Sequence, residues 1–209
     1  MYEFINDLDA FFCEYYAGYD KICVLKGYKM PLMQRSERQN GKMRAYTLPA
    51  NTMRLSLQEN AADLLRQLKE KLKDKTISFS FTTVGFFKRL RKREQYKIAY
   101  QTFIALLKMY KMDKENVEGL NVDKEVWANI RKGKFLPSKN LIFTLALVGH
   151  FTADDTQKML NMYNYDFEYD IEKDVVIAYL LTKKVFNADM VKAALDEYKI
   201  GYLFLENIG

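Results

Sequence analysis

The sequence predicts a mainly α-helical protein, a multi-helix bundle with at most one small β-hairpin near residues 32–48. Three observations favour this class. Apolar side chains recur at three- and four-residue spacing along most of the chain, as in amphipathic helices. Residues that cap helix N-termini precede several of these segments. A hydrophobic fraction of 49%, with only 9 Gly and 3 Pro, excludes a collagenous, linker-like or low-complexity chain.

The N-terminal part predicts two amphipathic helices with an irregular segment between them. The first lies in residues 3–16, and its apolar face consists of Phe4, Leu8, Phe11, Phe12 and Tyr15. The second follows a capping box formed by Ser56 and Glu59, and its apolar stripe consists of Leu57, Ala61, Leu64, Leu65, Leu68 and Leu72. Between the two helices Asn40–Gly41, a strong signal for a two-residue turn, predicts the basic hairpin.

Two structures are compatible with the segment that follows. Residues 76–81 alternate apolar and polar side chains, which is typical of a short strand. Alternatively, Thr82 or Thr83 caps a helix that runs to Arg93.

From residue 95 onward the pattern predicts a succession of helices. Their ranges are 95–111, 114–120, 123–131, 138–148, 153–163, 171–182 and 188–199. The apolar residues of the helix at 95–111 are Ile98, Phe103, Ile104, Leu106 and Leu107. Ser138, Thr152 and Asn187 are the expected N-caps of three helices, and Gly201 is expected to end the last. No internal repeat of fixed period accompanies them, so a bundle is expected.

Charge is distributed unevenly along the chain. The net charge is +6, but residues 150–209 hold 6 basic against 11 acidic side chains, whereas residues 31–149 carry about +13. Such asymmetry suggests a basic working surface attached to an acidic or neutral support. Ordinary fluctuation of surface charge is the alternative.

One stretch carries a specific pattern, residues 122–160. A helix with Val122, Trp127 and Ile130 as apolar positions leads into a basic glycine turn, Arg131-Lys132-Gly133-Lys134. Pro137 and Ser138 open the next helix, whose inward positions are Leu141, Ile142, Leu145 and Ala146. With the helices upstream, residues 95–163 resemble the helix-turn-helix unit of Xre/Cro-like repressors. The resemblance predicts that Trp127, Ile130, Leu141 and Leu145 are buried together.

The resemblance implies a DNA-binding, repressor-like transcriptional regulator without enzymatic activity. In such a unit one helix enters the major groove, and cations beside it contact phosphates. Lys124 and Asn129 are then base-facing, and Lys132, Lys134 and Lys139 lie near phosphates. The candidate DNA-binding residues are Lys124, Asn129, Arg131, Lys132, Lys134, Lys139, Arg91 and Arg93, the last two from the basic run at 88–97.

A protein-interaction adapter that keeps a degenerate helix-turn-helix scaffold is the alternative function. It is favoured by Asp123 and Glu125, whose carboxylates would face the DNA and repel phosphate. In this alternative the basic run at 88–97 is a solvated helix face.

Other classes of function lack their usual residues. The chain has 2 Cys and 1 His, and no motif for a nucleotide loop or a nucleophile elbow. The acidic residues from Asp166 to Asp174 lack the Gly and Glu of a calcium loop. We therefore expect no catalytic residues, no metal and no cofactor. An acidic N-terminal segment and no run of eighteen apolar residues predict a cytoplasmic protein without a membrane span.

Three regions are expected along the chain, or alternatively one compact domain. Residues 1–94 form a helical region with the hairpin, residues 95–163 the helix-turn-helix-like unit, and residues 164–209 an acidic helical region. The apolar stretch at the C-terminus consists of Tyr198, Ile200, Tyr202, Leu203, Phe204 and Leu205. It either docks onto the core or forms the interface of a homodimer.

Overall fold

The computed structural model describes residues 2–18, 34–39, 42–47, 61–72, 82–83, 93–112, 120 and 122–201, and every structural statement below concerns these residues. Most of them are helical. The helices are α1 (Tyr2–Tyr15), α4 (Ala61–Lys71), α6 (Arg93–Met109), α7 (Lys124–Arg131), α8 (Lys139–Val148), α9 (Ala153–Met162), α10 (Glu172–Thr182) and α11 (Ala188–Glu197). The strands are β1 (Gln34–Gln39), β2 (Lys42–Thr47), β3 (Thr82–Thr83) and β4 (Phe135–Leu136). The predicted mainly helical class is confirmed.

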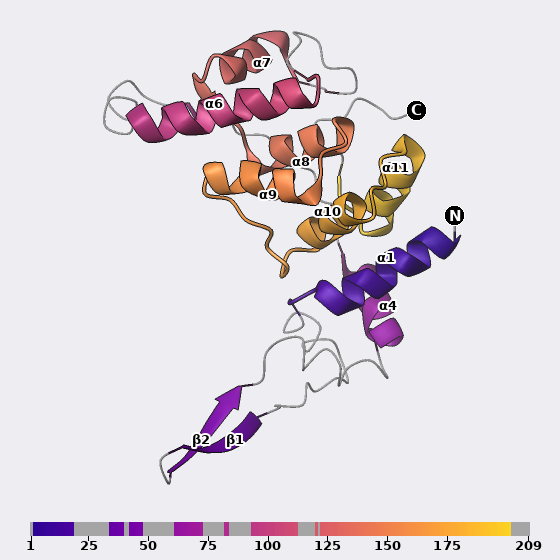
Figure 1. Ribbon diagram of the computed structural model, residues 1–209. Coiled ribbons are helices and arrows are strands. Elements are labelled where there is room, and N and C mark those ends of the chain that lie inside the picture. The colour runs from indigo at the N-terminus through magenta and orange to yellow at the C-terminus, as the bar shows by residue number, and fades with distance from the viewer. Residues whose placement is uncertain are drawn as a thin grey trace.

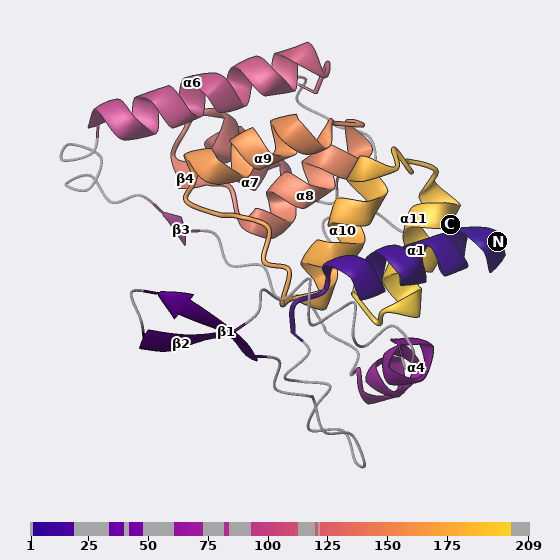
Figure 2. The same ribbon diagram turned by 60° about the horizontal axis from the view of Figure 1, so that its bottom comes forward.

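Helix α10 is the centre of the bundle. It contacts α1, α8, α9 and α11, while α6 packs on α9 and α4 packs on α1. All of its residues from 175 to 181 are buried, as expected for a helix that is apolar on every side. Figures 1 and 2 show α8–α11 between the α6–α7 pair on one side and the α1–α4 pair on the other.

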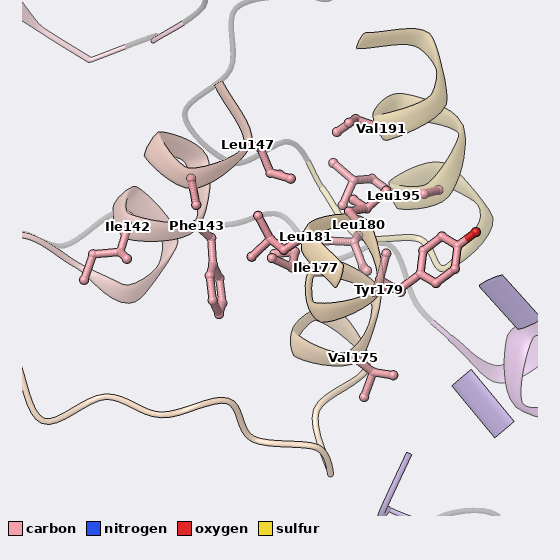
Figure 3. Packing of buried hydrophobic residues seen from close by; sticks show 14 of the residues in the cluster. Ile142, Phe143, Leu147, Val175, Ile177, Tyr179, Leu180, Leu181, Val191 and Leu195 are labelled. Atoms are coloured by element: carbon pink, nitrogen blue, oxygen red, sulfur yellow. The ribbon is translucent and has the colours of Figure 1, made fainter. Parts of the chain in front are cut away.

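One hydrophobic cluster fills the interior and extends from Leu8 to Ile200 along the sequence. Figure 3 shows side chains of α8 and of α11 pointing toward α10 from two sides. Phe143 and Leu147 come from α8, and Val191 and Leu195 come from α11. The cluster contains residues of all three predicted regions and therefore crosses both of their predicted boundaries.

The predicted hairpin is present. Strands β1 and β2 are antiparallel, and the register pairs Gln34 with Thr47 and Gln39 with Lys42. These last two residues flank the turn dipeptide Asn40–Gly41, which itself lies outside the described residues. The hairpin therefore falls within the expected range of 32–48.

A second, two-residue ladder joins distant parts of the chain. Strand β3 is antiparallel to β4, with Thr82 opposite Leu136 and Thr83 opposite Phe135. Three predicted features lie outside the described residues: the strand at 76–81, the capping box at Ser56 and Glu59, and the helix at 114–120 except for Leu120. The ladder ties the chain before α6 to the segment that follows α7.

Part of the C-terminal apolar stretch docks onto the bundle. Tyr198 and Ile200 are buried. The Tyr198 ring stacks on Phe12 at 4.5 Å between ring centroids, and its hydroxyl donates a hydrogen bond of 2.8 Å to Asp9. Residues 202–209 lie outside the described residues, so the predicted homodimer through this region stays a prediction.

The six helices from α6 to α11 all end in the same motif. After each helix one residue has a positive φ, and the next N–H donates to the carbonyl five positions earlier, which is the Schellman arrangement. The positive-φ residues are Lys111, Gly133, His150, Asn164, Lys184 and Lys199. Lys199 takes this role after α11, so the expectation that Gly201 ends the last helix was wrong. Only α7 uses glycine among these six helices.

The residue whose N–H donates to the carbonyl five positions earlier also distinguishes α7. After the other five helices this residue is apolar and packs inward: Met112, Phe151, Tyr165, Val185 and Ile200. After α7 it is Lys134, which is exposed. An apolar contact at this position normally holds a helix end against the core. The end of α7 lacks that contact and presents a polar, basic turn.

The left-handed positions give a stability prediction. Lys111→Gly should raise the free energy of unfolding by about 0.5–1 kcal/mol, because relief of the side-chain penalty at φ 57° exceeds the entropy cost of glycine. Gly133→Ala should lower it by about 1–2 kcal/mol, because it introduces that penalty at φ 66°. Urea denaturation followed by circular dichroism measures the free energy of unfolding of both variants. A change of the same sign in both would contradict the left-handed conformation at these positions.

Candidate nucleic-acid interface

Helix α7 is fixed to α6 at its C-terminal end. The hydroxyl of Tyr100, on α6, donates a hydrogen bond to the backbone carbonyl of Arg131. The ring of Tyr100 lies against Gly133, where an added Cβ would stand 3.1 Å from ring atom Cδ2. The glycine therefore serves two purposes, since it adopts the left-handed conformation and leaves room for the ring.

The N-terminal end of α7 is capped by Asp123. Its carboxylate accepts hydrogen bonds from the N–H groups of Glu125, at 2.8 Å, and Val126, at 3.2 Å. The sequence predicts that the Asp123 carboxylate faces DNA, but in the structure this side chain caps α7. The signal for the cap was its position directly before the apolar periodicity of α7.

The inner face of α7 packs as predicted. Trp127 is 3% exposed and Ile130 is 1% exposed, and Leu141 and Leu145 of α8 are fully buried. All four belong to the central cluster. The predicted burial of these residues is confirmed.

A cleft of about 510 Å³ lies between α6 and α7. Its lining residues are Tyr100, Ile104, Lys124, Trp127, Ala128, Arg131 and Lys132. Three of these are cations and none is a carboxylate. Ile104 was expected on the apolar face of its helix, whereas nothing in the sequence indicated that Tyr100 and α7 would enclose a cleft, because that requires the tertiary packing of the two helices.

Among the described residues, the cations at the two ends of α7 have no counterions. Lys124, Arg131, Lys132 and Lys134 make no ion pair with any residue that the structure describes. Lys124, Lys132 and Lys134 are exposed, and Arg131 is partly buried. The Nε atom of Arg131 is buried and has no hydrogen-bond partner in the described part of the chain. Within the described part of the chain, the site is therefore a positively charged surface without neutralising carboxylates.

Lys139 has a different role from the predicted phosphate contact. Its ammonium group lies 3.0 Å from Oε2 of Glu168 and also contacts Oδ2 of Asp174, whose side chain is fully buried. The Glu168 N–H donates a further hydrogen bond of 2.8 Å to the same Asp174 oxygen. Burial raises the pKa of the Asp174 carboxyl, and the hydrogen bond from Lys139 opposes that rise. Lys139 therefore neutralises a buried acid and is removed from the candidate set.

The other predicted residues are only partly brought together. Lys124 lines the cleft, whereas Asn129 is partly buried and does not. Five positions separate the two, which is about 140° around a helix, so they do not share a face. Arg91 and the side chain of Arg93 lie outside the described residues. Lys97 is exposed and precedes Tyr100 by one turn, so the end of the basic run lies on the same side of α6 as the cleft.

Comparison of the chain with protein-family models, curated proteins and solved structures finds no significant match. No described helix has both the length and the apolar character needed to cross a membrane. Within the described ranges no three His, Cys, Asp or Glu side chains are grouped so that they could hold a metal ion.

Proposed function

We propose that the protein is a non-enzymatic, repressor-like regulator that binds duplex DNA through the basic surface formed by α7 and the turn that follows it. One observation carries the proposal. Lys124, Lys132 and Lys134 are exposed and have no ion-pair partner among the described residues, whereas Lys139 and Lys69 are each held by two carboxylates. Cations that are not neutralised within the protein can neutralise DNA phosphates and so release the counterions condensed on the DNA, and this release favours binding.

Two features support the proposal. The polar end of α7 presents Lys132 and Lys134 on either side of Gly133, away from the core. In addition, the Asp123 carboxylate is occupied by two backbone N–H groups, which lessens the repulsion of phosphate that the sequence indicated. The C-terminal region, with its excess of acidic side chains, contributes the central helix α10 and acts as support.

The same geometry favours weak sequence specificity. Base edges are read by side chains that enter the groove together from one face. Because Lys124 and Asn129 lie about 140° apart around α7, only one of them can point into a groove at a time. We expect phosphate contacts to provide most of the affinity.

Substitution of the turn lysines tests the proposal. The double variant Lys132→Ala/Lys134→Ala should bind a mixed-sequence 20-base-pair duplex more weakly, and the slope of log affinity against log salt should fall by about 2, since each phosphate contact contributes about 0.9. The matched control is Lys71→Ala/Lys184→Ala, which removes two exposed lysines that lie outside the α6–α7 region. Fluorescence anisotropy at several salt concentrations gives both values.

Equal losses in the two double variants would show that only net charge matters, and the proposed surface would be wrong. No loss in either variant would favour the second candidate, a protein-interaction adapter.

Two exposed apolar residues on α6 support the adapter: Ile98 is 61% exposed and Met109 is 58% exposed. Eleven positions separate them, so they lie about 20° apart around the helix and are exposed on the same side of it.

A further inference from the structure

The cleft between α6 and α7 has properties that DNA binding does not require. We propose that it is a binding site for a small aromatic anion with the size and charge of a nucleoside monophosphate. This proposal does not rest on the DNA-binding function, although both use Lys124 and Lys132, because it also depends on Arg131, Tyr100 and Ala128 in the lining of the cleft.

The charge of the lining indicates an anion. Lys124, Arg131 and Lys132 line the cleft without a carboxylate among the lining residues. Lys124 and Arg131 are seven positions apart, so they lie within about 20° of each other around α7 and are separated by about 10 Å along it. Two cationic ends of one cleft at this separation match an elongated ligand with a phosphate at one end.

Arg131 identifies the end that would hold the phosphate. Its Nε atom is buried and has no hydrogen-bond partner in the described part of the chain, whereas the residue as a whole is only partly buried and lines the cleft, so a ligand would meet the terminal Nη groups of the guanidinium. Phosphate oxygens accept two parallel hydrogen bonds from the planar guanidinium group. Lys132, the next residue, lines the same end of the cleft and would supply a second positive charge.

The remaining lining indicates a planar apolar part of the ligand. Tyr100, Ile104 and Ala128 supply aromatic and aliphatic surface to the cleft, and Trp127, although only 3% exposed, borders it as well. Tyr100 is held in place by its hydrogen bond to the Arg131 carbonyl and by its contact with Gly133, so this wall exists before a ligand arrives. A volume of about 510 Å³ lies within the usual range of 300–1,000 Å³ for small-molecule sites.

Trp127 makes the proposal directly testable. It is the only tryptophan of the chain and lines the cleft, so its fluorescence reports on occupancy. Adenosine 5′-monophosphate, used as the probe, should change the emission saturably. Adenosine alone and inorganic phosphate alone should each bind about tenfold more weakly or worse, because each lacks half of the contacts. Calorimetry on the same solutions measures binding without the fluorophore.

Variants separate this site from the DNA surface. Arg131→Gln should weaken nucleotide binding about tenfold or more by removing the charged fork. Ala128→Leu fills the cleft without changing charge, so it should abolish nucleotide binding and leave DNA affinity unchanged. Lys134→Ala, outside the cleft, should weaken DNA binding only. Thermal melting of each variant confirms that it is folded.

Clear outcomes would overturn the proposal. Absence of a saturable signal in the unmodified protein at millimolar nucleotide excludes the site, whatever the DNA result. If inorganic phosphate bound as tightly as the nucleotide, an aromatic ligand would be excluded. Unchanged nucleotide binding by folded Ala128→Leu places the ligand elsewhere. If the unmodified protein bound the nucleotide but not DNA, the proposed DNA-binding function would be contradicted and the nucleotide site would stand.

Discussion

Replacing Trp127 with alanine is expected to lower the free energy of unfolding by about 3–5 kcal/mol, the range for truncation of a large buried aromatic side chain. Trp127 is 3% exposed and belongs to the cluster that also contains Ile130 and Leu141. Its removal leaves a cavity where α7 packs against the rest of the protein. Because the variant has no tryptophan, urea denaturation should be followed by circular dichroism.

Ile98→Ala is the matched control for this experiment. Ile98 is 61% exposed on α6, so its truncation should change the free energy of unfolding by less than about 0.5 kcal/mol. If the two substitutions had similar effects, α7 would not be anchored through Trp127, and the positions of Lys124 and Arg131 would no longer be fixed by the core.

Replacing Lys139 with alanine is expected to cost about 3–5 kcal/mol at neutral pH, because it leaves the fully buried carboxylate of Asp174 without its counterion. Asp174 lies in the first turn of the central helix α10, and one of its oxygens, Oδ1, already lacks a hydrogen-bond partner among the described residues. The loss should therefore be much larger than for an exposed lysine such as Lys132.

The pH dependence of this loss follows from the raised pKa of Asp174. Burial raises that pKa above 3.8, so the folded state takes up a proton more readily than the unfolded state, and the stability contribution of this group falls as the pH rises through the folded pKa. Without Lys139 the pKa rises further. The loss of unfolding free energy in Lys139→Ala should be fully present at neutral pH. It should become smaller as the pH falls and Asp174 becomes protonated.

Urea denaturation of the unmodified protein and Lys139→Ala at pH 7 and pH 4 measures this change. Lys139→Ala/Asp174→Asn should recover much of the stability at pH 7, because it removes the unpaired charge. A deficit that is equal at both pH values, or no recovery in the double variant, would contradict a buried ion pair.

The helices were largely predictable because their signals are local. The observed bounds of α8, α10 and α11 lie within two residues of those expected. The expected N-caps Ser138, Thr152 and Asn187 each accept a hydrogen bond from the first turn of their helix. Capping and periodicity involve residues within one or two turns, so a single sequence contains them.

The site was less predictable because it depends on contacts between distant segments. Whether Lys139 contacts phosphate or neutralises Asp174 is decided by the packing of α8 against α10, which leaves no local pattern. The cleft likewise arises where Tyr100 meets the end of α7. Periodicity also placed Ile98 with the apolar face of its helix, yet it is exposed, since it lies about 140° from buried Phe103 around the helix.

The salt dependence of DNA binding by the unmodified protein tests the central proposal most directly. If Lys124, Lys132 and Lys134 each contact a phosphate, the affinity for a mixed-sequence duplex should fall about 40-fold between 50 and 200 mM salt, from a slope of about −2.7. Anisotropy with a labelled duplex measures it. No binding at 50 mM salt, or an affinity that does not change with salt, would contradict a DNA-binding surface formed by α7 and the turn that follows it.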